Sequence, residues 1–331
     1  MAGLSLLAAC GSEQAETPVA QPERSEIRTT GNPAIDKLTR ALVDNPDDAN
    51  LYALRAELFY ENEGYDEAIS DLQKALALDS TNAVYLHLLA DAQLDYYQSA
   101  EALETLERTV RLYPERIQSL LKLSEFQLIL KQHDKSLETL ERILKLDPQN
   151  AEAYFMSGMV FKEKGDIPRA LNGFQTAIEN EPDLVDGWLE LGILFERRND
   201  PIALQYLDNA IRIDSMNIEA YMAKGNYYLN REAYEEAVEA YSSIHRIDPQ
   251  YTNGYLNTGL AYYGLEKWEE AYKQFDIAIN TDPTFTVAWY YRGLTSKQLG
   301  NGTAARKDFE QTLNFDPNFE RAREELEELN S

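Results

Sequence analysis

Cysteine is nearly absent from this chain, because Cys10 is the only one among 331 residues. A single thiol excludes an intrachain disulfide framework and any zinc or iron–sulfur site built from clustered cysteines. Histidine is almost as scarce, and His87, His133 and His245 show no metal-ligand spacing. No stretch approaches 18 consecutive apolar residues, so no segment is predicted to span a bilayer as a helix. We predict no metal and no cofactor.

Cationic side chains are also few. Lys and Arg number 31 against 57 Asp and Glu, which gives a formal net charge of −26. Affinity for nucleic acid comes largely from Lys and Arg, so this balance excludes nucleic acid as a partner and disfavours unaided docking on an anionic membrane. Phosphate-binding Gly-rich loops, nucleophile elbows and HExxH motifs are absent as well. We therefore predict a protein that is not an enzyme and has no evident small-molecule substrate. Apolar residues make up 44%, enough for a folded core.

The N-terminus carries a run of apolar and small residues that ends in the only cysteine. Its last four residues, Leu7-Ala8-Ala9-Cys10, resemble the bacterial lipobox. This resemblance implies that residues 1–10 are a lipoprotein signal segment and that Cys10 is the lipidated residue, which would hold the protein on a membrane. Because the first basic residue is Arg24, we expect the natural start to lie upstream of Met1 or to have been trimmed. Gly11, in place of Asp, favours the outer membrane facing the periplasm.

Prolines recur along the chain at a fixed interval. Those at 114, 148 and 182 are 34 residues apart, and so are those at 249, 283 and 317. An internal period of this length is typical of a repeat protein. If each repeat begins three residues after its proline position, residues 49–319 hold eight repeats, the fifth of which is one residue short. They begin at residues 49, 83, 117, 151, 185, 218, 252 and 286, and we number them 1 to 8.

Small and large residues alternate at fixed positions of these repeats. Position 8 is always Ala, Ser or Gly, position 20 is Ala or Ser, and position 24 is Leu, Phe or Tyr. Repeat 5 shows the full pattern with Trp188, Gly192, Ala203 and Leu207. These positions resemble the tetratricopeptide repeat, a 34-residue helix–turn–helix unit. The resemblance implies an all-α fold: a right-handed α–α superhelical solenoid of about eight repeats with a capping helix at each end.

The sequence predicts eighteen helices, namely a helix A and a helix B for each repeat and one helix at each end. Residues 11–32 form a flexible linker, residues 33–48 an N-terminal capping half-repeat, and residues 320–331 a C-terminal capping helix with Ala322, Leu326 and Leu329 facing inward. Three asparagines suit the N-caps of the following A helices: Asn82, Asn150 and Asn217. In repeat 5, we expect the missing residue to shorten the A–B turn rather than a helix.

The resemblance also implies that positions 2, 5, 9, 12 and 13 of each helix A face a concave groove. The best-known groove chemistry of the family is a clamp for a chain-terminal carboxylate, built from Lys, Arg and Asn. Here Asn226 and Asn257 occupy clamp positions, but Met222, Val287 and Tyr291 replace the three cations. Without a counter-charge, the carboxylate clamp is excluded.

The C-terminal repeats carry amides and apolar groups at these positions instead. Asn226 and Asn230 lie four residues apart on one helix A, and Asn253 and Asn257 on the next. An amide offers both a donor and an acceptor, which suits the backbone of an extended peptide. Apolar side chains at positions 5, 9 and 12 complete the predicted peptide groove: Phe155, Met159, Leu189, Ile193, Met222, Leu256, Leu260, Tyr263, Tyr290 and Leu294.

The first three repeats are more acidic at the groove positions, which include Glu57, Asp91, Asp95 and Glu125. These repeats either contact a basic segment or serve as a spacer. The whole pattern predicts a scaffold or adaptor that binds protein or peptide partners in its groove, lipid-anchored in the bacterial cell envelope, where it assists the assembly of other complexes. An alternative is a cytosolic adaptor or chaperone cofactor without a lipid anchor. RNA binding of the pentatricopeptide kind is disfavoured by the 34-residue period and the acidic charge.

Overall fold

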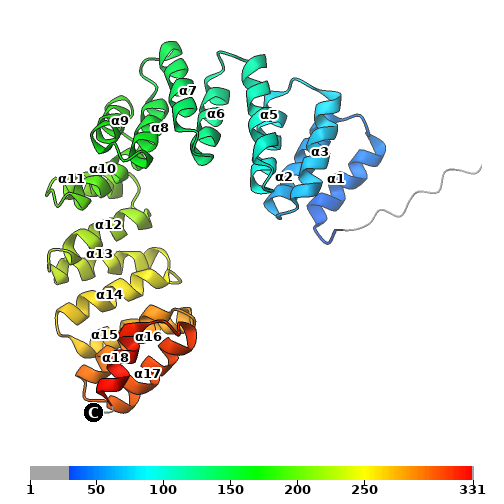
Figure 1. The fold of residues 1–331 in the computed structure, drawn as a ribbon. Coiled ribbons are helices and arrows are strands. Elements are labelled where there is room, and N and C mark those ends of the chain that lie inside the picture. The colour runs from blue at the N-terminus through cyan, green and yellow to red at the C-terminus, as the bar shows by residue number, and fades with distance from the viewer. Residues whose placement is uncertain (1–29, 330–331) are drawn as a thin grey trace, which may run out of the picture. The chain divides into compact units, whose positions relative to one another are not determined.

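The computed structural model describes residues 30–329, and within this range every regular element is an α-helix (Figure 1). The chain divides into two compact bodies, one ending at Leu112 and the other beginning at Tyr113. The lipobox, Cys10 and most of the predicted linker lie outside the described residues. The helices of the N-terminal body are α1 (Pro33–Asp44), α2 (Ala49–Glu61), α3 (Tyr65–Leu78), α4 (Ala83–Asp95) and α5 (Ser99–Leu112).

The C-terminal body contains repeats 3 to 8 and the final helix. Its helices are α6 (Ile117–Ile129), α7 (His133–Leu146), α8 (Ala151–Glu163), α9 (Ile167–Asn180), α10 (Val185–Arg197), α11 (Ala203–Ile213), α12 (Ile218–Leu229), α13 (Tyr234–Ile247), α14 (Thr252–Gly264), α15 (Trp268–Thr281), α16 (Thr286–Gln298), α17 (Gly302–Phe315) and α18 (Glu320–Glu328). The predicted all-α repeat fold with eighteen helices is thus confirmed for residues 30–329. In that range no helix is long and apolar enough to cross a membrane.

Several helix ends have a local cause in the sequence. The three predicted asparagine caps are confirmed, because Asn82, Asn150 and Asn217 each accept a hydrogen bond from a backbone N–H in the first turn of the following helix. The turn between helix A and helix B places position 15 in the left-handed region in all eight repeats, with φ between 54° and 75°. Only two of these residues are glycines, so the other six keep a conformation that is costly for most side chains.

The core of each repeat lies where helix A meets helix B. All eight residues at position 24 are at most 2% exposed, and they include Leu72, Phe174 and Tyr241. Where position 8 is Gly, the ring or side chain at position 24 lies directly against it. A Cβ on Gly225 would stand 2.2 Å from a ring carbon of Tyr241, and one on Gly259 would stand 2.5 Å from a ring carbon of Phe275. Glycine therefore sets the close approach of the two helices.

Aromatic residues at position 4 join consecutive repeats. The indole Nε1 of Trp188 donates to the carbonyl of Pro182 at 2.8 Å, and Trp289 donates to the carbonyl of Pro283 at 2.9 Å. Tyr154 makes the equivalent bond to the carbonyl of Pro148 at 3.2 Å. The proline that ends one helix B is thus also the acceptor that positions the next helix A.

Repeat 5 departs from the prediction. Helix α11 spans 11 residues, whereas the other seven B helices of the repeats span 14. Pro201 and Ile202 form a turn instead of helix, and the side chain of Asp200 accepts a hydrogen bond from the N–H of Ile202 at 3.0 Å. The expectation that the missing residue shortens only the A–B turn is wrong, because the tight Asp–Pro turn takes up the first residues of helix B.

The C-terminal helix packs as its pattern predicts. Ala322 is fully buried, and Leu326 and Leu329 pack against the cluster that contains Tyr290 and Phe309. The last repeat also holds a buried ion pair, in which the guanidinium of Arg292 bonds to Asp308 at 2.7 Å and to Asp276 at 2.6 Å. Repeat 1 has the pair equivalent to Arg292–Asp308 at the same two positions, with Arg55 and Asp71 2.6 Å apart.

Candidate functional site

The A helices of the C-terminal body contact one another as well as their own B helices. Such contacts join α6 to α8, α10 to α12 and α14 to α16. We call positions 2, 5, 9 and 12 of the A helices in the C-terminal body the A-helix face.

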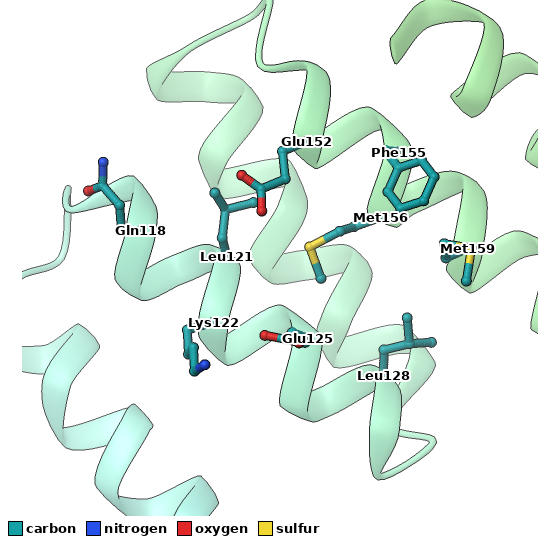
Figure 2. Close-up of a pocket in the computed structure, with 9 residues that line it drawn as sticks. All are labelled: Gln118, Leu121, Lys122, Glu125, Leu128, Glu152, Phe155, Met156 and Met159. Atoms are coloured by element: carbon teal, nitrogen blue, oxygen red, sulfur yellow. The ribbon is translucent and has the colours of Figure 1, made fainter. Parts of the chain in front are cut away.

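One hollow on this face lies between α6 and α8 (Figure 2). It has a volume of about 530 Å³ and is lined by Gln118, Leu121, Lys122, Glu125, Leu128, Glu152, Phe155, Met156 and Met159. Seven of these nine residues occupy positions 2, 5, 9 or 12 of their repeats, the positions assigned to the groove from the sequence. We call this site the α6–α8 hollow.

The floor of the hollow is apolar. Leu121 and Met156 are buried, whereas Leu128, Phe155 and Met159 remain partly exposed. The ring of Phe155 packs against that of Phe174, with 5.4 Å between the centroids. This contact ties Phe155, one residue of the floor, to the core of repeat 4.

The rim of the hollow is acidic. Glu125 and Glu152 are exposed, and the side chain of Met156 projects between them in the view of Figure 2. Partial burial raises the pKa of Glu152, and the negative charges of Glu125 and Glu181 raise it further. A positive charge placed beside these carboxylates would offset the repulsion between them and favour their charged form. Lys122 lies on the same side of α6, with its Nζ 5.7 Å from the centroid of the Phe126 ring.

The four predicted asparagines are not gathered into one hollow. The amide oxygen of Asn226 accepts a hydrogen bond from the Tyr241 hydroxyl at 2.7 Å, and Asn230 donates to Glu196 at 2.8 Å. The amide nitrogen of Asn257 lies 3.8 Å from the sulfur of Met222. The fourth asparagine, Asn253, is exposed and takes part in none of these three contacts. The role of the four amides in binding a peptide stays a prediction.

The predicted apolar groove residues divide into three groups. Phe155 and Met159 line the α6–α8 hollow. Leu189 and Tyr290 are buried in the core, at 4% and 7% exposed. The others are partly exposed, and most of them pack against core clusters of their own repeats: Ile193, Met222, Leu256, Leu260, Tyr263 and Leu294.

Sequence reasoning missed half of the hollow because it placed the groove in repeats 4 to 8. Leu121 and Leu128 occupy positions 5 and 12 of repeat 3, which had been set aside as acidic. The same position rule, applied to repeat 3, would have found them. Met156 at position 6 has no such signal, because its access to the hollow depends on how α6 and α8 pack.

The fold and this face define an α-helical repeat protein of the kind that binds other proteins. A family model described as tetratricopeptide repeat matches residues 34–83, 87–151 and 201–252, and a second model of the same description matches residues 152–183. The chain belongs to the tetratricopeptide repeat family. Proteins of this family generally act as non-catalytic scaffolds for protein interactions.

Solved structures share this fold at low sequence identity. The C-terminal part of a repeat-containing protein from Cytophaga hutchinsonii aligns with a TM-score of 0.58 and 17% identity, covering 72% of this chain and 98% of its own. A tetratricopeptide repeat protein from Parabacteroides merdae aligns with a TM-score of 0.51 and 17% identity, and the alignment covers 75% of this chain and 99% of that one. A chain of the APC/C hetero-tetramer Cut9–Hcn1 aligns with a TM-score of 0.54 and 14% identity, and the alignment covers 90% of this chain and 62% of that one.

These likenesses concern the fold alone. The chain spans less than two thirds of the matched chain of the Cut9–Hcn1 assembly. No curated protein matches the sequence.

Proposed function

We propose that this protein is a lipid-anchored scaffold of the bacterial cell envelope that binds a peptide segment of a partner protein on its A-helix face. The observation that carries the binding part is the α6–α8 hollow. Five apolar side chains form its floor, and such apolar concave surfaces are typical of partner sites.

The membrane anchor is proposed from the sequence Leu7-Ala8-Ala9-Cys10. Several acyl chains on Cys10 would give stable attachment, because a single chain binds membranes only marginally. With Gly11 after the cysteine, we propose the outer membrane as the site of attachment and the periplasm as the compartment of the repeats.

The anchor is tested by labelling cells with radioactive palmitate. We expect label on the wild-type chain and none on Cys10→Ala, with the matched variant Ser12→Ala labelled as the wild type is. An unlabelled wild-type protein found in the soluble fraction would favour the cytosolic adaptor instead.

The binding face is tested by affinity purification from membranes followed by mass spectrometry. The wild-type chain is compared with Leu128→Ser/Met159→Ser, which removes apolar surface from the hollow, and with Leu78→Ser/Leu112→Ser, which removes exposed apolar surface from two B helices. We expect partners that are lost only from the first variant. Equal recovery from all three would contradict a partner site in the α6–α8 hollow.

A further inference from the structure

The charges on the A-helix face of the C-terminal body are not balanced. Its cations at position 12 are already neutralised, since Lys162 pairs with Glu190 at 2.6 Å and Lys297 pairs with Glu325 at 2.7 Å. The lining of the α6–α8 hollow itself holds two carboxylates, Glu125 and Glu152, and one cation, Lys122. The face therefore presents negative charge to an incoming ligand.

The acidic character continues along the same line of positions. Position 2 of repeats 4, 5 and 6 is Glu152, Asp186 and Glu219, and all three are exposed. Position 5 of the same repeats is apolar, with Phe155 at the hollow. A ligand that follows these helices meets apolar groups beside a row of carboxylates.

The two properties together identify the ligand chemistry. We propose that the α6–α8 hollow binds a partner segment in which a large apolar side chain stands next to Lys or Arg, with the apolar group on the floor and the cation between Glu125 and Glu152. This inference rests on the proposed function and names the class of partner for the same site.

The geometry of the floor and rim supports this assignment. The apolar floor at Leu121 and Met156 lies between the two rim carboxylates, so one short segment can reach both (Figure 2). Partial burial raises the pKa of Glu152, and the nearby charges of Glu125 and Glu181 raise it further, so a cation beside this carboxylate would be favourable.

The test uses three blocked twelve-residue peptides and the full-length chain. The first peptide repeats Leu-Lys, the second Leu-Glu and the third Ser-Lys, and binding is measured by calorimetry at physiological salt. Each partly exposed charge pair changes affinity by up to about fivefold, so the loss of both carboxylate charges in Glu125→Gln/Glu152→Gln is expected to weaken the Leu-Lys peptide about tenfold. The control Glu138→Gln/Glu310→Gln removes the same charge from exposed sites on α7 and α17 and is expected to change affinity less than twofold.

The apolar requirement is tested with Met159→Ser, whose fold is checked by circular dichroism. We expect it to weaken the Leu-Lys peptide about tenfold, since a few apolar anchors carry most of the energy of such sites. The Ser-Lys peptide is expected to bind at least tenfold more weakly than Leu-Lys to the wild-type chain.

The outcomes separate this inference from the proposed function. If Leu-Glu binds as tightly as Leu-Lys and Met159→Ser weakens it, the hollow binds peptides but the cationic requirement is wrong. If Glu125→Gln/Glu152→Gln behaves like its control, the inference is also wrong. If Met159→Ser changes the binding of no peptide and of no captured partner, both the inference and the peptide-binding function are wrong.

Discussion

The close packing of Gly259 against an aromatic ring predicts how repeat 7 responds to a larger residue at this position. A Cβ added to Gly259 would lie 2.5 Å from Cε1 and 2.7 Å from Cδ1 of Phe275, a ring that is fully buried. Carbon atoms normally approach to about 3.5–4.0 Å, so the ring or the helix must move. Overpacking of this kind costs up to about 3 kcal/mol, and the better helix propensity of alanine returns at most about 1 kcal/mol. We expect Gly259→Ala to destabilise the repeat by about 2 kcal/mol.

The chain itself suggests the compensating change. Where position 8 is Ala, in repeats 1 and 2, position 24 is Leu. Phe275→Leu alone leaves a small cavity and costs about 1 kcal/mol. In Gly259→Ala/Phe275→Leu the new methyl group occupies that space, so the double variant should be more stable than the sum of the two single losses by about 1–2 kcal/mol.

Hydrogen exchange of α14 and α15, read by mass spectrometry, is the suitable assay because repeat arrays need not unfold in one step. The control is Gly302→Ala at the start of α17, where the nearest side-chain atom would be 3.8 Å from the new Cβ. It should change protection little. The close-approach argument is refuted if α14 and α15 exchange as slowly in Gly259→Ala as in the wild type. It is also refuted if the stability losses of Gly259→Ala and Phe275→Leu simply add in the double variant.

Two further predictions concern charged groups. Arg292→Met leaves Asp308 buried without its partner and should cost about 3 kcal/mol, measured as loss of exchange protection in α16 and α17. Burial lowers the pKa of His245, whose ring stacks on Tyr255 at 3.9 Å between centroids. Since the unfolded chain then binds the proton more readily, stability should fall as the pH drops below about 6.5. His245→Phe keeps the stack and should remove this part of the pH dependence of urea unfolding; an unchanged slope would contradict the assignment.

The sequence was sufficient for the fold because the repeat imposes the same contact eight times. A small residue at position 8 against a large one at position 24 is a short-range, steric relation, and it predicts the helix pairs directly. The asparagine caps were predictable for a similar reason, because the side-chain oxygen of Asn150 accepts its hydrogen bond from Ala153, only three residues further along the chain. Repeat 5 was predicted less well, since the choice between a shorter turn and a shorter helix depends on the turn geometry around Asp200.

The candidate site was less predictable because it depends on side-chain contacts between repeats. Asn226 is directed to Tyr241 by a hydrogen bond between positions 9 and 24, which no periodicity reveals. Leu189 and Phe155 both occupy position 5 of their repeats, yet Leu189 is buried and Phe155 lines the hollow. Such differences arise from the packing of neighbouring A helices, which the composition of a single repeat does not specify.

The indole bonds at position 4 make the chain a source of local optical signals. Two of its three tryptophans, Trp188 and Trp289, are tied to proline carbonyls at the starts of repeats 5 and 8, while Trp268 begins α15 and contacts Tyr263. Loss of an indole hydrogen bond changes the polarity around the ring. Variants that keep one tryptophan each would therefore report by fluorescence the opening of one chosen part of the array, without any added dye.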